Sequence, residues 1–217
     1  MHAVSPYAFW VVLTRLGEVQ IALPLALLGM VVLLRNAESR ALAVWWMVLL
    51  TLAIALTTAT KLAFIGWGLG WPALDFTGVS GHAMFAAAVY PLLLGCVLAA
   101  PASRQLQTLA IVAGCALALL VGISRVVVGA HSVSEVIAGL CLGGLVSALP
   151  LGMLRRPRVR VGPVVPAMVL VFAALMPTQA PASLAHPLVV RLALLLSGNA
   201  APFTRADMLR MSGLPSG

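Results

Sequence analysis

Charge is scarce in this chain, and negative charge is the scarcest. Only 8% of its 217 residues are charged, and just five of these are Asp or Glu. Hydrophobic residues instead make up 62% of the chain, whereas soluble globular domains contain about 45–50%. Because no water-soluble fold could bury so much apolar surface, the composition excludes a soluble protein and predicts a membrane protein.

Cysteine and targeting signals are also nearly absent. The three cysteines, Cys96, Cys115 and Cys141, all fall inside apolar runs and have no pair spacing. We interpret them as small core residues, the alternative being a metal site or a disulfide. No basic region precedes the first apolar run, and no convincing cleavage site follows it, so we expect no removable signal peptide.

Six apolar runs predict six membrane-spanning helices. Most approach the roughly 20 residues that cross a bilayer core, and backbone groups in lipid must be satisfied within a helix or a closed barrel. The alternation typical of barrel strands is missing. The sequence therefore predicts an all-α, polytopic six-helix bundle that forms a single membrane-embedded domain over residues 1–217, with spans at residues 19–34, 41–60, 83–103, 105–124, 132–154 and 161–176.

The segments outside these runs are predicted to lie at the membrane surface. Residues 1–18 form either an interfacial helix or the start of the first span. Residues 178–217 are predicted as an interfacial helix and a tail. The apolar run at 187–197 would reach only about 16 Å as a helix, which is too short to cross. The stretch from 199 to 217 is predicted to be irregular. Gly139 and Gly143 form a small-xxx-small step that predicts close helix packing.

The formal charge of +8 is distributed as in a membrane protein, and we expect no nucleic-acid partner. Seven of the thirteen basic residues lie in three short connections that alternate topology places on one side, namely Arg35, Arg40, Arg104, Arg155, Arg156, Arg158 and Arg160. By the positive-inside rule this side is cytoplasmic. The opposite side carries the most polar clusters of the chain. In a Gram-negative bacterium the protein would lie in the inner membrane, with this side facing the periplasm.

The first of these clusters combines His131, Glu135 and Arg125. His131 and Glu135 are four residues apart on a predicted helix, so their side chains share one face. A carboxylate that accepts the Nδ1 proton would fix the ring tautomer and leave Nε2 free as a nucleophile. Between Arg125 and His131 there is room only for a tight reversal, for which Gly129 is suited. The guanidinium then returns beside the imidazole, and its planar fork fits two oxygens of a phosphate.

The second cluster is Ser80, Gly81 and His82, directly before the third apolar run. Ser80 is a candidate N-cap, and exposed N–H groups at a helix start bind anions. His82 at the mouth of such a site could act as a general acid. Lys61, at the end of the second run, adds a positive charge. Asp75, in the loop between them, is interpreted as a turn former, the alternative being a substrate ligand.

Together these residues resemble the type 2 phosphatidic acid phosphatase superfamily of integral membrane lipid phosphatases. Ser80-Gly81-His82 matches its second sequence block, and Ser124-Arg125 with His131 six residues on matches its third. Lys61 matches the lysine of the first block. The resemblance covers residues 55–150, which would form the catalytic core.

The resemblance implies hydrolysis of a lipid phosphate or pyrophosphate without a cofactor or metal. It implies His131 as the nucleophile, His82 as the acid, and Glu135 as the carboxylate that supports His131. Lys61, Ser80, Gly81 and Arg125 would hold the phosphate. The partners expected are the lipid phosphate substrate and membrane lipids, and the oligomeric state stays open.

Three positions depart from the superfamily pattern. Val79 replaces a proline, and Glu135 replaces an aspartate. No Arg-Pro pair follows Lys61, because the seventh position after it is Gly68. Loss of a preorganised donor of this kind costs roughly 3–4 kcal/mol in the transition state. We therefore expect one of three outcomes. Arg15 or a main-chain donor replaces the missing arginine, the enzyme is slow, or its substrate differs from that of the superfamily.

Four rival interpretations remain open at this point. The chain could transfer phosphate to another lipid, or it could be an inactive relative that only binds lipid phosphates. His82 and His131 could also be axial ligands of a haem. Finally, a zinc site could use both histidines with Glu135 as the third ligand.

Overall fold

A computed structural model describes residues 6–98, 103–153 and 185–213 of the chain. Within these ranges the regular secondary structure is helical, and strand pairing is limited to an isolated bridge between Trp71 and Phe76. The predicted all-α class is confirmed.

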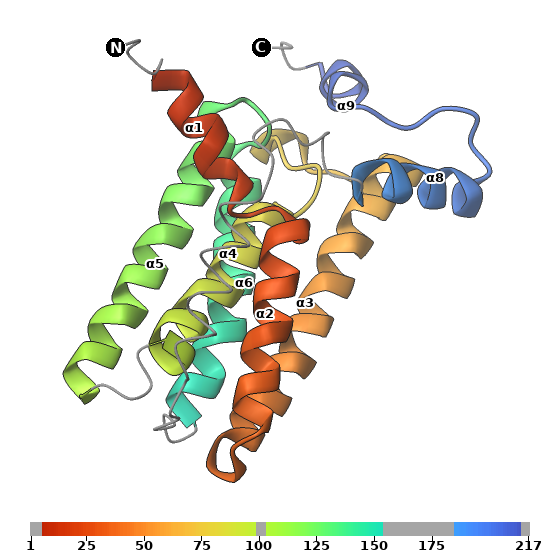
Figure 1. Ribbon diagram of the computed structural model, residues 1–217. Coiled ribbons are helices and arrows are strands. Elements are labelled where there is room, and N and C mark those ends of the chain that lie inside the picture. The colour runs from red at the N-terminus through yellow and green to blue at the C-terminus, as the bar shows by residue number, and fades with distance from the viewer. Residues whose placement is uncertain (1–5, 99–102, 154–184, 214–217) are drawn as a thin grey trace.

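Figure 1 shows the arrangement of the helices in the described residues. Their bounds are α1 Pro6–Arg15, α2 Val19–Leu34, η1 Ala37–Ser39, α3 Arg40–Trp67, η2 Pro72–Leu74, α4 Gly81–Leu92, η3 Leu93–Leu98, α5 Arg104–Val127, α6 Val133–Met153, α8 Ala185–Ser197 and α9 Arg205–Met211. The turn η3 is a π-helix that directly continues α4 beyond Pro91.

Three helices of the described part are long and apolar enough to cross a membrane, namely Ala37–Trp67, Arg104–Val127 and Val133–Gly152. The pair α1 and α2 forms a fourth candidate, bent by 42° at the break. The apolar helix Gly81–Cys96 is shorter than a span, although a longer one was predicted at residues 83–103. The predicted span 161–176 lies outside the described residues, and the six-span topology stays a prediction.

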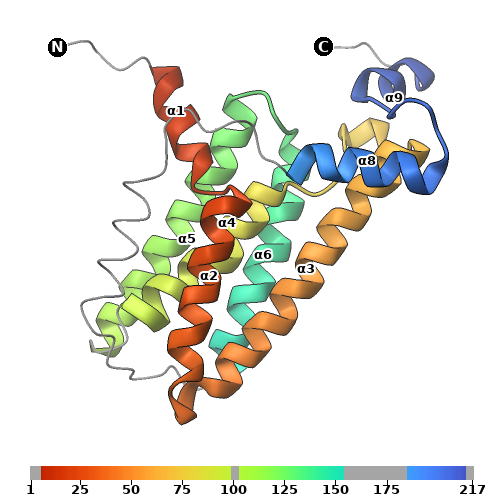
Figure 2. The same cartoon turned by 45° about the vertical axis from the view of Figure 1, so that its right-hand side comes forward.

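Helix α4 is the central element of the bundle, with α2, α3, α5 and α6 around it (Figures 1 and 2). Every residue from Ala83 to Leu92 is buried, as expected for a helix that is apolar on all sides. Its alanines leave room for close neighbours.

The predicted small-xxx-small contact lies between α6 and α4. A β-carbon on Gly139 would lie 2.5 Å from the Ser80 carbonyl oxygen, and one on Gly143 only 2.1 Å from that of Met84. Since real β-carbons do not come so close to backbone, only glycine permits this approach. The prediction is confirmed, and the contact brings the start of α6 beside the start of α4.

Of the three cysteines, only Cys96 is buried, whereas Cys115 and Cys141 are exposed, and all three are free. The interpretation of all three as core residues is therefore wrong for two of them. Their side chains lie on the outer faces of α5 and α6, where an apolar thiol suits a membrane helix.

The connections that carry Arg35, Arg40 and Arg104 lie at one end of the bundle, and the polar clusters lie at the other (Figure 1). At the polar end, α8 packs across the end of α3 (Figure 2). The prediction of an irregular stretch after residue 199 is wrong for residues 205–211, because α9 is closed by a capping box between Thr204 and Asp207. A helix covers the predicted interfacial run at 187–197, and its position in an interface stays a prediction.

Candidate active site

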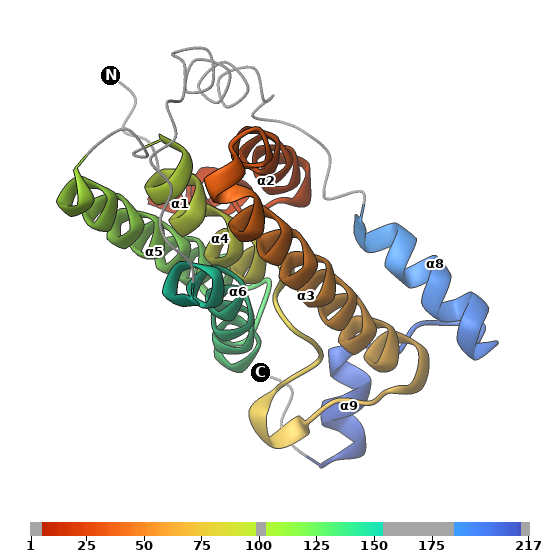
Figure 3. The same cartoon turned by 90° about the horizontal axis from the view of Figure 1, so that it is seen from below.

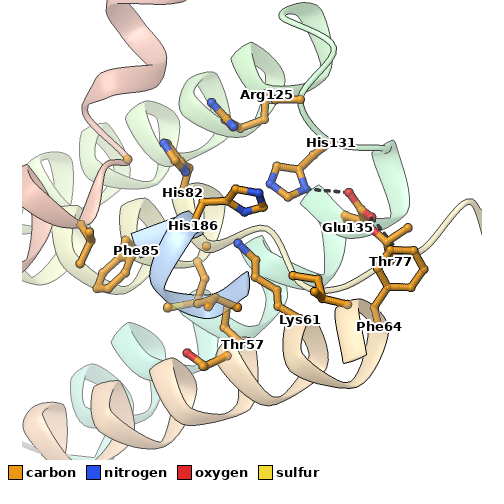
Figure 4. Close-up of a pocket in the computed structure, with 18 of the residues that line it drawn as sticks. Thr57, Lys61, Phe64, Thr77, His82, Phe85, Arg125, His131, Glu135 and His186 are labelled. Carbon is orange, nitrogen blue, oxygen red and sulfur yellow. Dashed lines mark hydrogen bonds and ion pairs between the residues drawn. The ribbon is translucent and has the colours of Figure 1, made fainter. Parts of the chain in front are cut away.

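A cavity of about 760 Å³ opens at the polar end of the bundle. Its walls come from α2, α3, α4, the connection between α5 and α6, and the C-terminal segment from His186 to Arg205. Figure 4 shows the side chains of His82, His131, Lys61 and His186 directed into this common space. Helices α3, α4 and α8 and the connection between α5 and α6 thus bring polar residues together in one cavity.

His131 and Glu135 form the best-defined contact of the cavity. His131 Nδ1 lies 2.6 Å from Glu135 Oε2, and the carboxylate is completely buried. Because a carboxylate oxygen can only accept from the ring, Nδ1 carries the proton and Nε2 is left with a lone pair. Burial lowers the pKa of His131 below its ordinary value, although the hydrogen bond and the charge of Glu135 act in the opposite direction. Near neutral pH the ring is neutral and able to act as a nucleophile.

Arg125 and His131 are held together by the predicted reversal. The backbone N–H groups of Ala130 and His131 both donate to the Arg125 carbonyl, at 3.0 and 3.2 Å. Gly129 takes a left-handed φ of 70° within this turn, which a glycine adopts without strain. The prediction that Gly129 forms the turn is confirmed.

The guanidinium of Arg125 keeps unused donor capacity. Its Nη1 donates to Thr14 Oγ1 at 2.8 Å, which fixes the side chain. Its Nε is buried and has no hydrogen-bond partner among the described residues. A buried donor of this kind is costly unless a ligand completes it, and an anionic oxygen is the natural acceptor. Glu18, which lines the same cavity, is the acidic residue whose charge stabilises that of Arg125.

Ser80 takes the predicted N-cap position of α4, but its hydroxyl does not cap the helix. The hydroxyl is completely buried and lacks a hydrogen-bond partner within the described ranges. The Ser80 backbone N–H donates instead to the carbonyl of Glu135, at 3.1 Å. The expectation of a side-chain cap is therefore wrong. Ser80 also lies behind the cavity wall, whereas Gly81 and His82 line it.

Lys61 reaches the start of α4 from α3. A β-carbon built on Gly81 would lie 3.9 Å from Lys61 Nζ, so the ammonium stands beside the first turn of α4 (Figure 4). No carboxylate of the described part of the chain lies within ion-pair distance of it. The ammonium thus adds a positive charge, without a direct ion-pair partner among the residues that the structure describes, at the N-terminus of α4.

The structure brings six of the seven predicted site residues to the wall of one cavity, with Ser80 directly behind it. Sequence reasoning missed several further polar residues of the lining, among them Thr77, His186 and Arg205. The pattern Thr204-x-x-Asp207 signals a helix start and could have located α9. No local pattern in the sequence indicates that this helix returns to Glu135.

Position 68, where the first motif block has its arginine, is occupied by Gly68 with a left-handed φ of 69°. A β-carbon there would lie 3.0 Å from the Phe203 ring, so an arginine would be strained and crowded. The predicted substitute Arg15 pairs with Glu18 at 3.8 Å and is not part of the cavity lining. Among the described lining residues, the second guanidinium of the cavity is that of Arg205.

The cofactor alternatives find little support in this geometry. Across residues 6–98, 103–153 and 185–213, no group of three His, Cys, Asp or Glu side chains could hold a metal ion. The two histidines of the haem alternative lie in a cavity that also contains Lys61 and Arg125, a charge pattern that suits an anion.

These features define an all-helical membrane protein with a cationic, histidine-containing cavity at one end of its helices. Residues 68–158 match the family model of the PAP2 superfamily. The chain is 44% identical over 147 residues to the "Uncharacterized 22.5 kDa protein in cps region" of Klebsiella pneumoniae, a match that covers 68% of this chain and 70% of that protein. The chain belongs to the PAP2 superfamily.

The predicted resemblance to the type 2 phosphatidic acid phosphatases is therefore confirmed. Members of this superfamily are typically phosphatases, and membership supports a phosphoric ester hydrolase located in a membrane. No solved structure matches the chain.

Proposed function

We propose that this protein hydrolyses a lipid phosphate or pyrophosphate without a metal ion, through a phosphohistidine at His131. The observation that carries the proposal is the convergence of His131, His82 and Arg125 on one cavity, with the buried Glu135 behind the nucleophile. Such a cavity positions a phosphate and neutralises its charge, which are the main tasks in phosphoryl transfer.

The phosphate group would bind between Lys61, Arg125 and the N-terminal N–H groups of α4 at Gly81. The Nε of Arg125, unpaired in the described part of the chain, and the position of the Lys61 ammonium beside Gly81 support this placement, and a helix N-terminus adds further donors. The buried hydroxyl of Ser80 stands behind this turn and would support it.

The reaction would proceed in two steps. His131 Nε2 attacks phosphorus in line, the bond to the leaving oxygen breaks, and His82 gives that oxygen its proton. Glu135 stabilises the cationic ring that results. A water molecule, deprotonated by His82, then attacks the phosphohistidine, which releases phosphate and restores neutral His131.

The lipid part would lie along the apolar wall of the cavity. Leu23 of α2, Ile54 of α3 and Phe85 of α4 line this side, and hydrocarbon binds such a surface by leaving water. The basic connections lie at the far end of the bundle from this cavity. Their position favours a six-helix bundle whose cavity faces away from the cytoplasm. In a Gram-negative bacterium this would be the periplasmic face of the inner membrane.

Phosphate release from a panel of lipids in detergent tests the proposal. Phosphatidic acid, phosphatidylglycerol phosphate, undecaprenyl pyrophosphate and lipid A would be compared with a metal chelator present throughout. We expect release from at least one lipid, loss of release in His131→Ala, and normal release in Val133→Ala, which alters an exposed neighbour on the first turn of α6.

The outcomes separate the rival functions. Equal rates for the wild type and His131→Ala would contradict the proposal. Transfer of a labelled phosphate to a second lipid, without free phosphate, would identify a phosphotransferase. Binding of the lipids without either reaction would identify an inactive relative.

A further inference from the structure

Glu135 is held by more groups than its contact with His131 requires. Oε2 accepts from His131 Nδ1 and, at 3.1 Å, from the Ser132 backbone N–H. Oε1 accepts from the backbone N–H and the hydroxyl of Thr77, at 2.8 and 2.5 Å. The same oxygen accepts from Arg205 Nη2 at 2.8 Å. Five donors thus surround a carboxylate that is completely buried.

Among these donors, Arg205 belongs to the C-terminal helix α9 and carries a permanent positive charge. Its Nη1 also pairs with the carboxylate of Asp75, so one guanidinium joins the loop before α4 to Glu135. Asp75, with φ of 48°, ends the turn η2. The interpretation of Asp75 as a turn former is confirmed, and its side chain also anchors Arg205.

Hydrogen bonds to the end of α3 fix the C-terminal segment just before Arg205. Asn199 Nδ2 donates to the Gly66 carbonyl at 2.6 Å, and Phe203 N–H donates to the Ile65 carbonyl at 2.9 Å. These are end carbonyls of α3, which lack partners within their own helix. Met208 of α9 packs in a small apolar cluster with Phe64 and Ile65. Figure 3 shows α9 beside the loop that follows α3.

We propose that Arg205 is a positioning residue for His131 and acts through Glu135. The catalytic consequence rests on the proposed function. Glutamate is one methylene longer than aspartate, and the added torsion gives its carboxylate more positions. Thr77 and Arg205 hold Oε1, and this leaves Oε2 in the one orientation that meets Nδ1. The segment from Asn199 to Arg205 therefore helps to position His131, because it holds Arg205 against Glu135.

Arg205 also sets the charge that His131 experiences. By sharing the negative charge of Glu135, it reduces the stabilisation of a protonated ring. Its loss leaves a less compensated carboxylate, and the pKa of His131 must rise. The other charged or titratable groups that line this cavity stay the same in such a variant, namely Lys61 of α3, His82 of α4, Arg125 of α5, Glu135 of α6, His186 of α8 and Glu18 before α2.

The test compares Arg205→Gln and Arg205→Lys with the matched control Arg210→Gln. Arg210 lies on the same helix, and its side chain is 79% exposed. Steady-state phosphate release gives kcat, KM and the pH profile. Titration of His131 is followed in parallel by NMR of imidazole-labelled protein in detergent, with its signal assigned by loss in His131→Ala. The NMR readout does not require activity.

We expect Arg205→Gln to lower kcat on the order of tenfold to a hundredfold, as misplaced catalytic groups do, with a smaller change in KM. The acid limb of the profile and the His131 titration should both move to higher pH. Arg205→Lys keeps the charge but loses the planar fork that contacts Asp75 and Glu135, so its kcat should lie between those of the wild type and Arg205→Gln. Arg210→Gln should match the wild type in every readout.

An unchanged His131 titration in Arg205→Gln would overturn the proposal, as would a kcat equal to that of Arg210→Gln. If Arg205→Gln does not fold, Arg205→Lys decides through kcat alone, since it keeps the charge. A wild-type kcat in that variant would overturn the proposal. Wild-type protein that releases no phosphate from any lipid would contradict the proposed function alone. The NMR titration would then still decide the role of Arg205.

Discussion

The Nδ1 atom of His131 lies 2.6 Å from Oε2 of Glu135, one helical turn further along the chain. Glu135 lies in the first turn of α6 and His131 two residues before that helix begins, and Gly139 and Gly143 bring α6 against α4. Helix α6 therefore has two roles. Its packing against α4 places His131 beside His82, and its Glu135 fixes the tautomer of His131.

Replacing Glu135 with glutamine removes the charge of this pair while it keeps the shape. The amide group can no longer accept from all five donors, and the tautomer of His131 is no longer fixed. We expect kcat to fall by roughly 10²- to 10⁴-fold, as in other histidines that lose their carboxylate. Phosphate release measures this effect, and Glu38→Gln, an exposed carboxylate at the other end of the bundle, is the control. Activity within tenfold of wild type in a folded Glu135→Gln would contradict the role.

The pH profile of kcat/KM should be bell-shaped, because His131 must be neutral and His82 protonated. Burial, together with the charges of Arg125, His131 and Lys61, lowers the pKa of His82 well below its ordinary value of 6.5, so the maximum of the profile should lie on the acid side of neutrality. Protonation of His131 removes the attacking lone pair, so activity is lost as pH falls through its pKa. Burial lowers this pKa from its ordinary value of 6.5, and the acid limb should have its midpoint below that value. A midpoint above it, or a rate that is flat from about pH 4 to 9, would contradict these roles. His82→Ala should remove the basic limb.

Local sequence patterns predicted the features that depend on neighbouring residues. The i, i+4 spacing of His131 and Glu135, the reversal at Gly129 and the close packing at Gly143 are each set within a few residues. The apolar runs located the helices for the same reason, since hydrocarbon requires every backbone group to be paired within its helix.

Features that depend on distant segments were not predictable in this way. Arg205 contacts Glu135 across seventy residues, and the contact exists because α9 docks on the end of α3. The bend between α1 and α2 likewise follows from packing, since a β-carbon on Gly17 would lie 2.7 Å from that of His82. The unpaired hydroxyl of Ser80 also depends on burial beneath α6, which its N-cap pattern does not indicate.

The contact between α6 and α4 predicts a sharp difference between two adjacent glycines. In Gly143→Ala the new β-carbon would lie 2.1 Å from the Met84 carbonyl oxygen, and the helices must separate. Overpacking of this kind costs about 1–3 kcal/mol of stability. In Gly144→Ala the β-carbon meets nothing within 4 Å, and we expect no loss. Thermal unfolding in detergent compares the two variants, and equal midpoints would show that the contact is not close in the folded protein.

Arg125→Lys tests whether the site needs a guanidinium or only a positive charge. The lysine would keep the charge but lose the planar fork and the contact of Nη1 with Thr14, which sits at 2.8 Å. If Arg125 binds two phosphate oxygens, kcat/KM should fall by about 10²- to 10³-fold, and inorganic phosphate should inhibit more weakly. Arg104→Lys, at the opposite end of the same helix, should change neither quantity. Wild-type inhibition by phosphate in Arg125→Lys would mean that the substrate binds elsewhere in the cavity, because a point charge in that position cannot reproduce a two-oxygen contact.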